Sequence, residues 1–108
     1  MKHSMVIVTC PGQASAQKIA RELIREQLAA CVQLTPVTSV YTWEGRVEEE
    51  REIRLTIKTR TALYKEVENH IRQNHEYQIP QILRIPIETG LPDYLNWIEQ
   101  NTREPFHL

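Results

Sequence analysis

The segment Pro36–Thr61 constrains the fold more than any other part of the chain, because it has the pattern of an unusually long β-hairpin. Glu44-Gly45 marks the reversal. Along the return arm, one alternating set of positions is largely apolar and the other is polar or charged, as in a half-buried strand; the apolar set contains Val47, Ile53, Leu55 and Ile57. A strand from Arg46 to Thr59 would be about 45 Å long at roughly 3.3 Å per residue. A compact chain of this size is only about 34 Å across, so the hairpin tip must overhang.

An overhanging hairpin that carries apolar side chains needs a cover. Val40, Tyr41 and Trp43 lie on the first arm, close to the tip. Exposed ribbons of this kind promote association, and the most available partner is another copy of the same chain. The sequence therefore predicts that the protein functions as an oligomer.

Composition excludes several classes of protein. With 108 residues, the chain is expected to form a single domain spanning residues 1–108. A net charge of −1 argues against sequence-independent nucleic-acid binding, which needs a basic surface. No apolar run approaches the ~20 residues of a membrane-spanning helix. The apolar run at the N-terminus is too short to predict a signal peptide. Two cysteines do not make a disulfide framework, so we expect reduced thiols and a cytoplasmic location.

The remaining chain alternates strand-like and helix-like patterns. Met5–Cys10 predicts a strand, Ala14–Ala30 a helix, and Val32–Tyr41 a second strand that Pro36 breaks or bulges. After the hairpin, Thr61 is a candidate N-cap for a helix to about Gln73, and Gln81–Ile87 predicts a fourth strand. A last helix starts near Pro92, with a buried stripe of Tyr94, Leu95 and Ile98, and Arg103–Leu108 forms a tail.

This order, β-α-β-β-α-β plus a C-terminal helix, predicts an α+β fold of the ferredoxin-like split type. Two helices would cover one face of an antiparallel sheet. The other face and the extra helix would be left for a neighbouring subunit. A fold shared by many proteins does not by itself indicate a function.

Metal-binding motifs are weak. Neither a CxxC pair nor an HxxxH helix is present. His3 and His107 fall in termini that we expect to be frayed, and His70 on the exposed side of a helix. His75 lies in a loop, where a surface or hydrogen-bonded histidine is commoner than a ligand. Cys10 and Cys31 are each expected to be structural, although copper could use cysteine and histidine from different subunits.

Two charged features have competing interpretations. Glu48-Glu49-Glu50 and Glu52 are expected to form a solvated acidic strand, because alternation prevents three of these carboxylates from converging on a hard cation. Lys58 lies late in the return arm. It could be solvated, or it could project into an intersubunit cleft with Tyr41, His75 or Tyr77 and hold an anionic ligand.

The chain resembles the CutA family, the divalent-ion tolerance proteins. The matching segments extend over almost the whole sequence in one register: Ala29–Val32, Ser39–Tyr41, Trp43–Val47, Ile57–Thr59, His75–Pro80, Leu83–Ile87 and Tyr94–Ile98. The resemblance implies a ferredoxin-like homotrimer in which long hairpins wrap onto neighbouring subunits, similar to the trimer of PII signalling proteins. It also implies a role in tolerance of copper and other divalent metals.

Position by position, the resemblance implies a ligand cleft formed by Tyr41, Trp43, Lys58, His75, Tyr77 and Tyr94, with Cys31 nearby. Cys31 and His75 are the candidate metal ligands, and a divalent metal such as Cu²⁺ is the candidate cofactor. The chain departs from the family pattern at Glu76, where a proline is usual, and at Gln81, where a glutamate is usual. Some members have a His-His pair where this chain has Asn74-His75, so a copper site that depends on that pair or on a carboxylate at residue 81 lacks its ligands here.

The sequence thus favours a cytoplasmic homotrimer that binds a metal ion or a small ligand between subunits, without catalysis and without nucleic-acid or membrane partners. Two alternatives stay open at this point. One is a PII-like signalling module that reports ligand occupancy to a partner protein. The other is an enzyme acting on an anionic small molecule, with Lys58 as the electrostatic group and His75 or Tyr77 as the acid or base.

Overall fold

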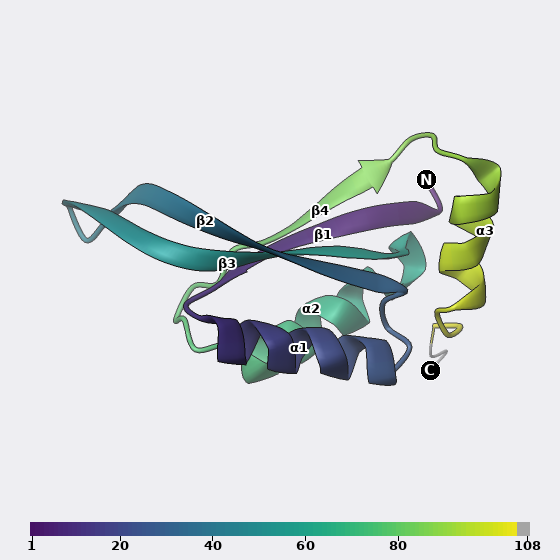
Figure 1. The fold of residues 1–108 in the computed structure, drawn as a ribbon, viewed down its shortest axis with the longest axis horizontal. Coiled ribbons are helices and arrows are strands. Elements are labelled where there is room, and N and C mark those ends of the chain that lie inside the picture. Colours follow the sequence, from purple (N-terminus) through teal and green to yellow (C-terminus); the bar gives the residue numbers. More distant parts are fainter. Residues whose placement is uncertain (106–108) are drawn as a thin grey trace.

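Four antiparallel strands form one sheet in the order β2-β3-β1-β4. The computed structural model describes residues 1–105. The strands are β1 (His3–Cys10), β2 (Cys31–Trp43), β3 (Arg46–Arg60) and β4 (Ile82–Ile87), and the helices are α1 (Gln13–Arg25), a short 3₁₀ turn η1 (Thr61–Leu63), α2 (Tyr64–Asn74) and α3 (Pro92–Gln100). Helices α1 and α2 cover one face of the sheet, and α3 stands at the end remote from the hairpin tip (Figure 1). This arrangement confirms the predicted ferredoxin-like fold with its extra C-terminal helix.

The β2–β3 hairpin extends beyond the rest of the molecule, as predicted (Figure 1). Its strands pair without interruption from Cys31 opposite Lys58 to Trp43 opposite Arg46. The longest dimension of the chain is 43 Å, which exceeds the roughly 34 Å expected for a compact domain of this size. The tip of the hairpin has no helix beneath it.

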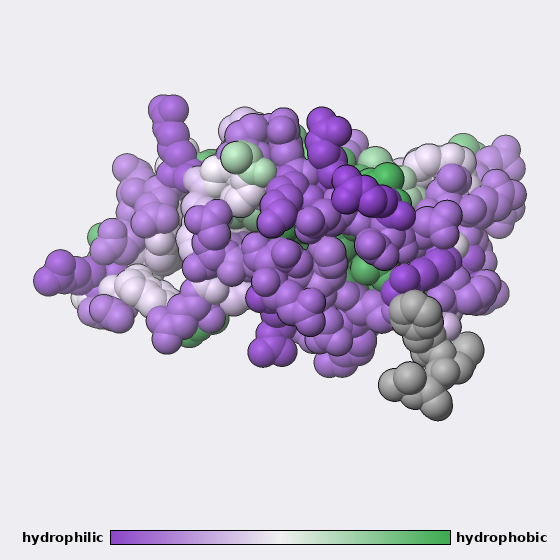
Figure 2. Space-filling model, turned by 90° about the horizontal axis from the view of Figure 1, so that it is seen from below, coloured by the Kyte–Doolittle hydropathy of each residue, from purple (hydrophilic) through white to green (hydrophobic). Residues whose placement is uncertain are grey.

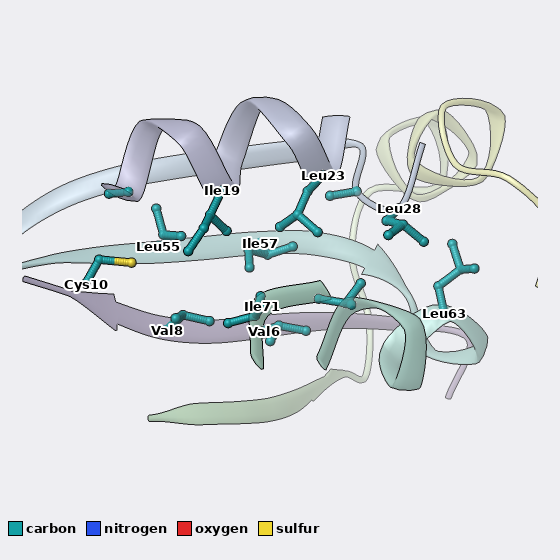
Figure 3. Close-up of a cluster of buried hydrophobic side chains, with 13 residues drawn as sticks. Val6, Val8, Cys10, Ile19, Leu23, Leu28, Leu55, Ile57, Leu63 and Ile71 are labelled. Atoms are coloured by element: carbon teal, nitrogen blue, oxygen red, sulfur yellow. The ribbon is translucent and has the colours of Figure 1, made fainter. Parts of the chain in front are cut away.

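The hydrophobic core lies between the two helices and the sheet (Figure 3). Alternate side chains of the central strands point toward the helices, because neighbouring residues of a strand face opposite ways. The fully buried members include Val6, Val8, Leu55 and Ile57 from β1 and β3, Ile19 and Leu23 from α1, and Val67 and Ile71 from α2. Seen from the helix side, the surface is mostly hydrophilic (Figure 2).

Two local predictions about the first helix and the second strand were wrong. Helix α1 ends at Arg25, five residues before the predicted Ala30. Gln27 adopts a left-handed conformation with φ of 58°, and the amide of Leu28 donates to the carbonyl of Leu23 at 2.9 Å, so the chain leaves the helix axis there. Pro36 neither breaks nor bulges β2, because β2 is an edge strand, where a missing amide hydrogen bond is tolerated.

Other predictions failed because tertiary contacts override local pattern. Thr61 does not cap α2; its hydroxyl lies 2.6 Å from that of Ser4. His3 is not frayed but only 8% exposed, and it bonds Glu99 of α3 at 3.0 Å. His70 is half-buried rather than exposed, with its ring 3.1 Å from Glu22 of α1. His107 lies outside the described residues.

The buried stripe predicted for the last helix is only partly correct. Ile98 is fully buried, but Tyr94 is 38% exposed. Helix α3 packs against the end of the sheet rather than over its face, so a smaller part of its surface is covered (Figure 1). An apolar side of α3 therefore remains accessible, next to the uncovered face of the sheet.

The turn of the hairpin provides a test of the backbone conformation. Glu44 and Gly45 both have positive φ, 51° and 79°, as a two-residue type I′ turn requires. We expect Gly45→Ala to lower the free energy of unfolding by about 1 kcal/mol, because an L side chain is strained at this φ. Gly12→Ala is the matched control. A Cβ would meet no atom within 4 Å at either glycine, but the φ of Gly12 is −158°. Denaturant unfolding would measure both variants, and equal losses would contradict the turn assignment.

Candidate functional site

The principal depression near the hairpin lies between the base of its overhanging part and the loop that connects α2 to β4. We call it the hairpin cleft. Its volume is about 770 Å³, and it is lined by Thr9, Ser39, Val40, Tyr41, Trp43, Glu48, Glu50, Glu52, Glu76, Tyr77, Gln78, Ile79 and Gln81. Most of the strand residues lie on the face of the sheet that the helices leave uncovered. Residues that are opposed across two antiparallel strands share a face, so Tyr41 lies on the same face as Glu48.

A hydrogen bond between Tyr77 and Glu52 joins the loop to the hairpin. The Tyr77 hydroxyl donates to Oε2 of Glu52 at 2.8 Å. Burial and the neighbouring carboxylate raise the pKa of Tyr77 well above its usual value. Tyr77 is therefore a neutral hydrogen-bond donor at physiological pH, and it fixes the position of Glu52 in the cleft.

His75 is held by both ring nitrogens. Its Nδ1 accepts from the backbone amide of Tyr77 at 3.1 Å. The proton must then reside on Nε2, which donates to the carbonyl of Thr9 at 2.7 Å. The ring also lies 4.9 Å from that of Tyr77. His75 thus ties the α2–β4 loop to the end of β1, and it could bind a metal only by giving up one of these bonds.

Lys58 and Tyr94 form a separate cluster at the other end of the uncovered face. The Lys58 ammonium lies 5.5 Å from the centroid of the Tyr94 ring, a cation–π contact. Trp97 stacks on Tyr94 with centroids 5.5 Å apart. Cys31 is opposite Lys58 on β2. Along β3, Lys58 is ten residues from Glu48, which is opposite Tyr41, six from Glu52, which Tyr77 bonds, and four from Arg54, which is opposite the Thr9 that His75 bonds. At ~3.3 Å per residue these separations are roughly 33, 20 and 13 Å, so one chain does not bring Lys58 to any of the three side chains.

The candidate metal ligands do not converge within one chain. Cys31 belongs to the Lys58 cluster, whereas His75 is bonded to Thr9 near the hairpin cleft. Among residues 1–105, no group of three or more histidine, cysteine, aspartate or glutamate side chains is placed to hold a metal ion. Cys10 is buried, and burial raises the pKa of its thiol to about 11, so it is protonated at neutral pH and a poor ligand.

The acidic strand was only partly predicted. Glu48 and Glu50 lie on the accessible wall of the cleft, but Glu52 is 7% exposed rather than solvated. A two-residue turn at Glu44-Gly45 already fixes the pairing of Tyr41 with Glu48, so the sequence contained the signal for this wall. The opposite wall, formed by Tyr77 and its loop, had no such signal.

Comparison with known proteins identifies the family. Residues 4–101 match the family described as CutA1 divalent ion tolerance protein. The chain belongs to this family. It is 38% identical over 98 residues to the divalent-cation tolerance protein CutA of Archaeoglobus fulgidus, covering 91% of this chain and 96% of that protein. It is 40% identical over 100 residues to mouse protein CutA, covering 92% of this chain.

Solved structures of CutA proteins have the same fold. CutA1 from Oryza sativa superposes with a TM-score of 0.93 at 40% identity, covering 96% of each chain. CutA from Xylella fastidiosa gives a TM-score of 0.92 at 35% identity and covers 95% of this chain and 100% of its own. The family name refers to cation tolerance rather than to a catalysed reaction.

The relatives differ in length and location. This chain spans little more than half of the mouse, Arabidopsis thaliana and rice CutA proteins: 56%, 55% and 57% of their lengths. The Arabidopsis protein is described as chloroplastic, and the Archaeoglobus structure as a periplasmic protein. Within residues 1–105, no helix has the length and apolar character needed to cross a membrane.

The Tyr77–Glu52 bond is testable through the pH dependence of stability. We expect Tyr77→Phe to lower the free energy of unfolding by roughly 1–3 kcal/mol at pH 7, because the buried Glu52 carboxylate loses its donor. The pKa of Tyr77 is higher in the folded state than in the unfolded state, where it is about 10, so folding favours the protonated hydroxyl. This contribution to the free energy of unfolding is fully present below pH 10 and is lost as the pH rises from 10 toward the folded-state pKa. The difference between variant and parent should therefore narrow above pH 10.

Tyr94→Phe is the matched control, since no described residue bonds the Tyr94 hydroxyl. Urea unfolding from pH 7 to 11, at one fixed protein concentration, would measure all three proteins. A Tyr77→Phe variant as stable as the parent at pH 7 would refute the structural role of the bond.

Proposed function

We propose that this chain serves divalent-cation tolerance as a homotrimer that binds a small ligand in clefts formed between its subunits. The observation that carries the proposal is the uncovered face of the sheet, which runs from the hairpin cleft to the Lys58 cluster. Its large apolar side chains include Leu83, 53% exposed, and Ile85, 42% exposed, and at its two ends lie Trp43, 39% exposed, and Trp97, 40% exposed. Large apolar side chains this exposed, on a face that no described helix covers, are typical of a subunit interface.

A second copy would also complete the predicted cleft. The family-derived residues divide into two groups in one chain, with Tyr41, Trp43, His75 and Tyr77 at the hairpin and Lys58 and Tyr94 at the far end. Subunits packed through the uncovered face can place the hairpin group of one chain beside the Lys58 group of the next. A ring that closes with three such heterologous contacts leaves no open interface.

We assign the tolerance role to this assembled cleft rather than to a copper site of Cys31 and His75. Those two side chains lie apart, and both nitrogens of His75 are hydrogen-bonded. Cys10 and Cys31 are free thiols, which fits a reducing compartment. On this basis we place the protein in the cytoplasm, unlike the relatives described as periplasmic or chloroplastic.

The trimer is tested by placing a charge in the apolar surface of the hairpin. We expect Trp43→Asp to dissociate the assembly, because a carboxylate would be buried without a partner at the interface. Light scattering should then report 12.7 kDa for the variant and three times that mass for the parent. Gln73→Asp, which adds the same charge on an exposed position of α2, should remain trimeric. An intact trimer for Trp43→Asp would contradict the proposed interface.

A further inference from the structure

Helix α3 forms one wall of the Lys58 cluster, but the hydrophobic core does not hold it in place. Of the nine residues of α3, only Ile98 is buried, and Ile98 is not part of the core between the other two helices and the sheet. The helix stands at the end of the sheet rather than over its face (Figure 1). Polar contacts therefore have a larger share in fixing the position of α3 than in fixing that of α1 or α2.

Arg60 of β3 makes four hydrogen bonds to the end of α3 and to the residues that follow it. Its Nε donates to the Thr102 hydroxyl at 2.8 Å, and its Nη2 donates to the backbone carbonyls of Glu99 and Thr102. Its Nη1 donates to the Glu104 carboxylate at 3.1 Å. Carbonyls in the last turn of a helix have no partner within the helix, and the helix dipole favours a cation beside them. Arg60 thus caps α3.

His3 of β1 adds a second contact at the same end of α3. It is opposite Arg60 in the register of β1 with β3, and its ring lies 3.0 Å from Oε2 of Glu99. This contact involves one side chain of the helix, whereas Arg60 reaches two backbone carbonyls. We therefore expect Arg60 to have the larger effect on where the helix lies.

Lys58 contacts the other end of α3 from the same strand as Arg60. The two residues are two apart on β3, so their side chains leave the same face of the sheet at a separation of roughly 6.7 Å. Lys58 lies against the ring of Tyr94, which precedes Glu99 by five residues, or roughly 7.5 Å along a helix. Two cations of one strand thus contact two successive parts of α3, in the same order and at a similar spacing.

We propose that Arg60 is a positioning residue of the assembled cleft: by capping α3, it sets the distance between the Tyr94 ring and the Lys58 ammonium. The proposal rests on the proposed function in one respect, since it takes Lys58 and Tyr94 to belong to the ligand site. It adds to that site a residue that acts through the placement of a helix rather than by touching a ligand.

Arg60→Gln in the full chain tests the proposal. We expect the amides of α3 to exchange their hydrogens at least about tenfold faster, because the loss of charge-assisted hydrogen bonds makes local opening of the helix easier. The amides of α1 and β1 should exchange as in the parent. The Lys58 amine should also react faster with acetic anhydride, since the Tyr94 ring no longer covers it. Mass spectrometry measures both quantities.

Three further variants define the role of the guanidinium. Arg72→Gln is the matched control, since it removes the same charge from an exposed position of α2, and it should leave both readouts unchanged. Arg60→Lys keeps the charge but loses the fork of donors, so it should give an intermediate exchange rate. Thr102→Val removes the acceptor of Nε and leaves Arg60 itself intact, so it should accelerate exchange in α3 by less than Arg60→Gln does.

Unchanged exchange of α3 and unchanged reactivity of Lys58 in Arg60→Gln would overturn the proposal, because His3 and Ile98 would then hold the helix without Arg60. An equal change in Arg72→Gln would overturn it as well. If Arg60→Gln does not fold, the same two readouts in Thr102→Val decide, and parental values there refute the proposal.

The mass of each variant, measured by light scattering in the same buffer, keeps this outcome separate from the proposed function. A trimer whose α3 is unaffected by Arg60→Gln refutes the positioning role alone. A parent protein that is a monomer, and whose α3 is loosened by Arg60→Gln, refutes the trimer alone.

Discussion

The uninterrupted pairing of β2 with β3 is the constraint on which the rest of the structure depends. A register that holds from Cys31 opposite Lys58 to Trp43 opposite Arg46 forces the hairpin past the helices. The overhang has two consequences. It leaves apolar side chains near the tip without a cover inside the chain, and it places a wall of carboxylates beside the α2–β4 loop. The proposed assembly and the proposed ligand site therefore both depend on one geometric feature.

The contacts of the α2–β4 loop convert this geometry into a defined cleft. His75 bonds the backbone of β1 and the backbone of its own loop, and Tyr77 reaches across to Glu52 on β3. These bonds hold a loop without regular structure against two strands. They also keep the Glu52 side chain buried in the wall of the cleft. The same bonds explain why a histidine in a family associated with metals is a structural residue in a single chain.

Much of the fold could be predicted from local pattern. The alternation of Leu55 and Ile57 with polar residues identifies the faces of β3, and Glu44-Gly45 fixes the register of the hairpin. Local pattern failed where a long-range contact decides the outcome. The end of α1 depends on the left-handed Gln27, and the burial of His3 depends on Glu99, which is 96 residues away. Pro36 was misread because its tolerance depends on β2 being an edge strand, a property of the whole sheet.

The candidate site was predictable only in part, for the same reason. The resemblance to a known family supplied Tyr41, Trp43, Lys58, His75, Tyr77 and Tyr94, but not how one chain divides them between two ends of the sheet. The partnership of Glu52 with Tyr77 joins a strand to an irregular loop, and no spacing in the sequence encodes it.

Native mass spectrometry of the unmodified protein at low micromolar concentration tests the central claim most directly, because the claim concerns what covers the hairpin. The account predicts a dominant species at three times 12.7 kDa. A dominant single chain under the same conditions would mean that the hairpin is stable without a neighbour, and it would contradict the account.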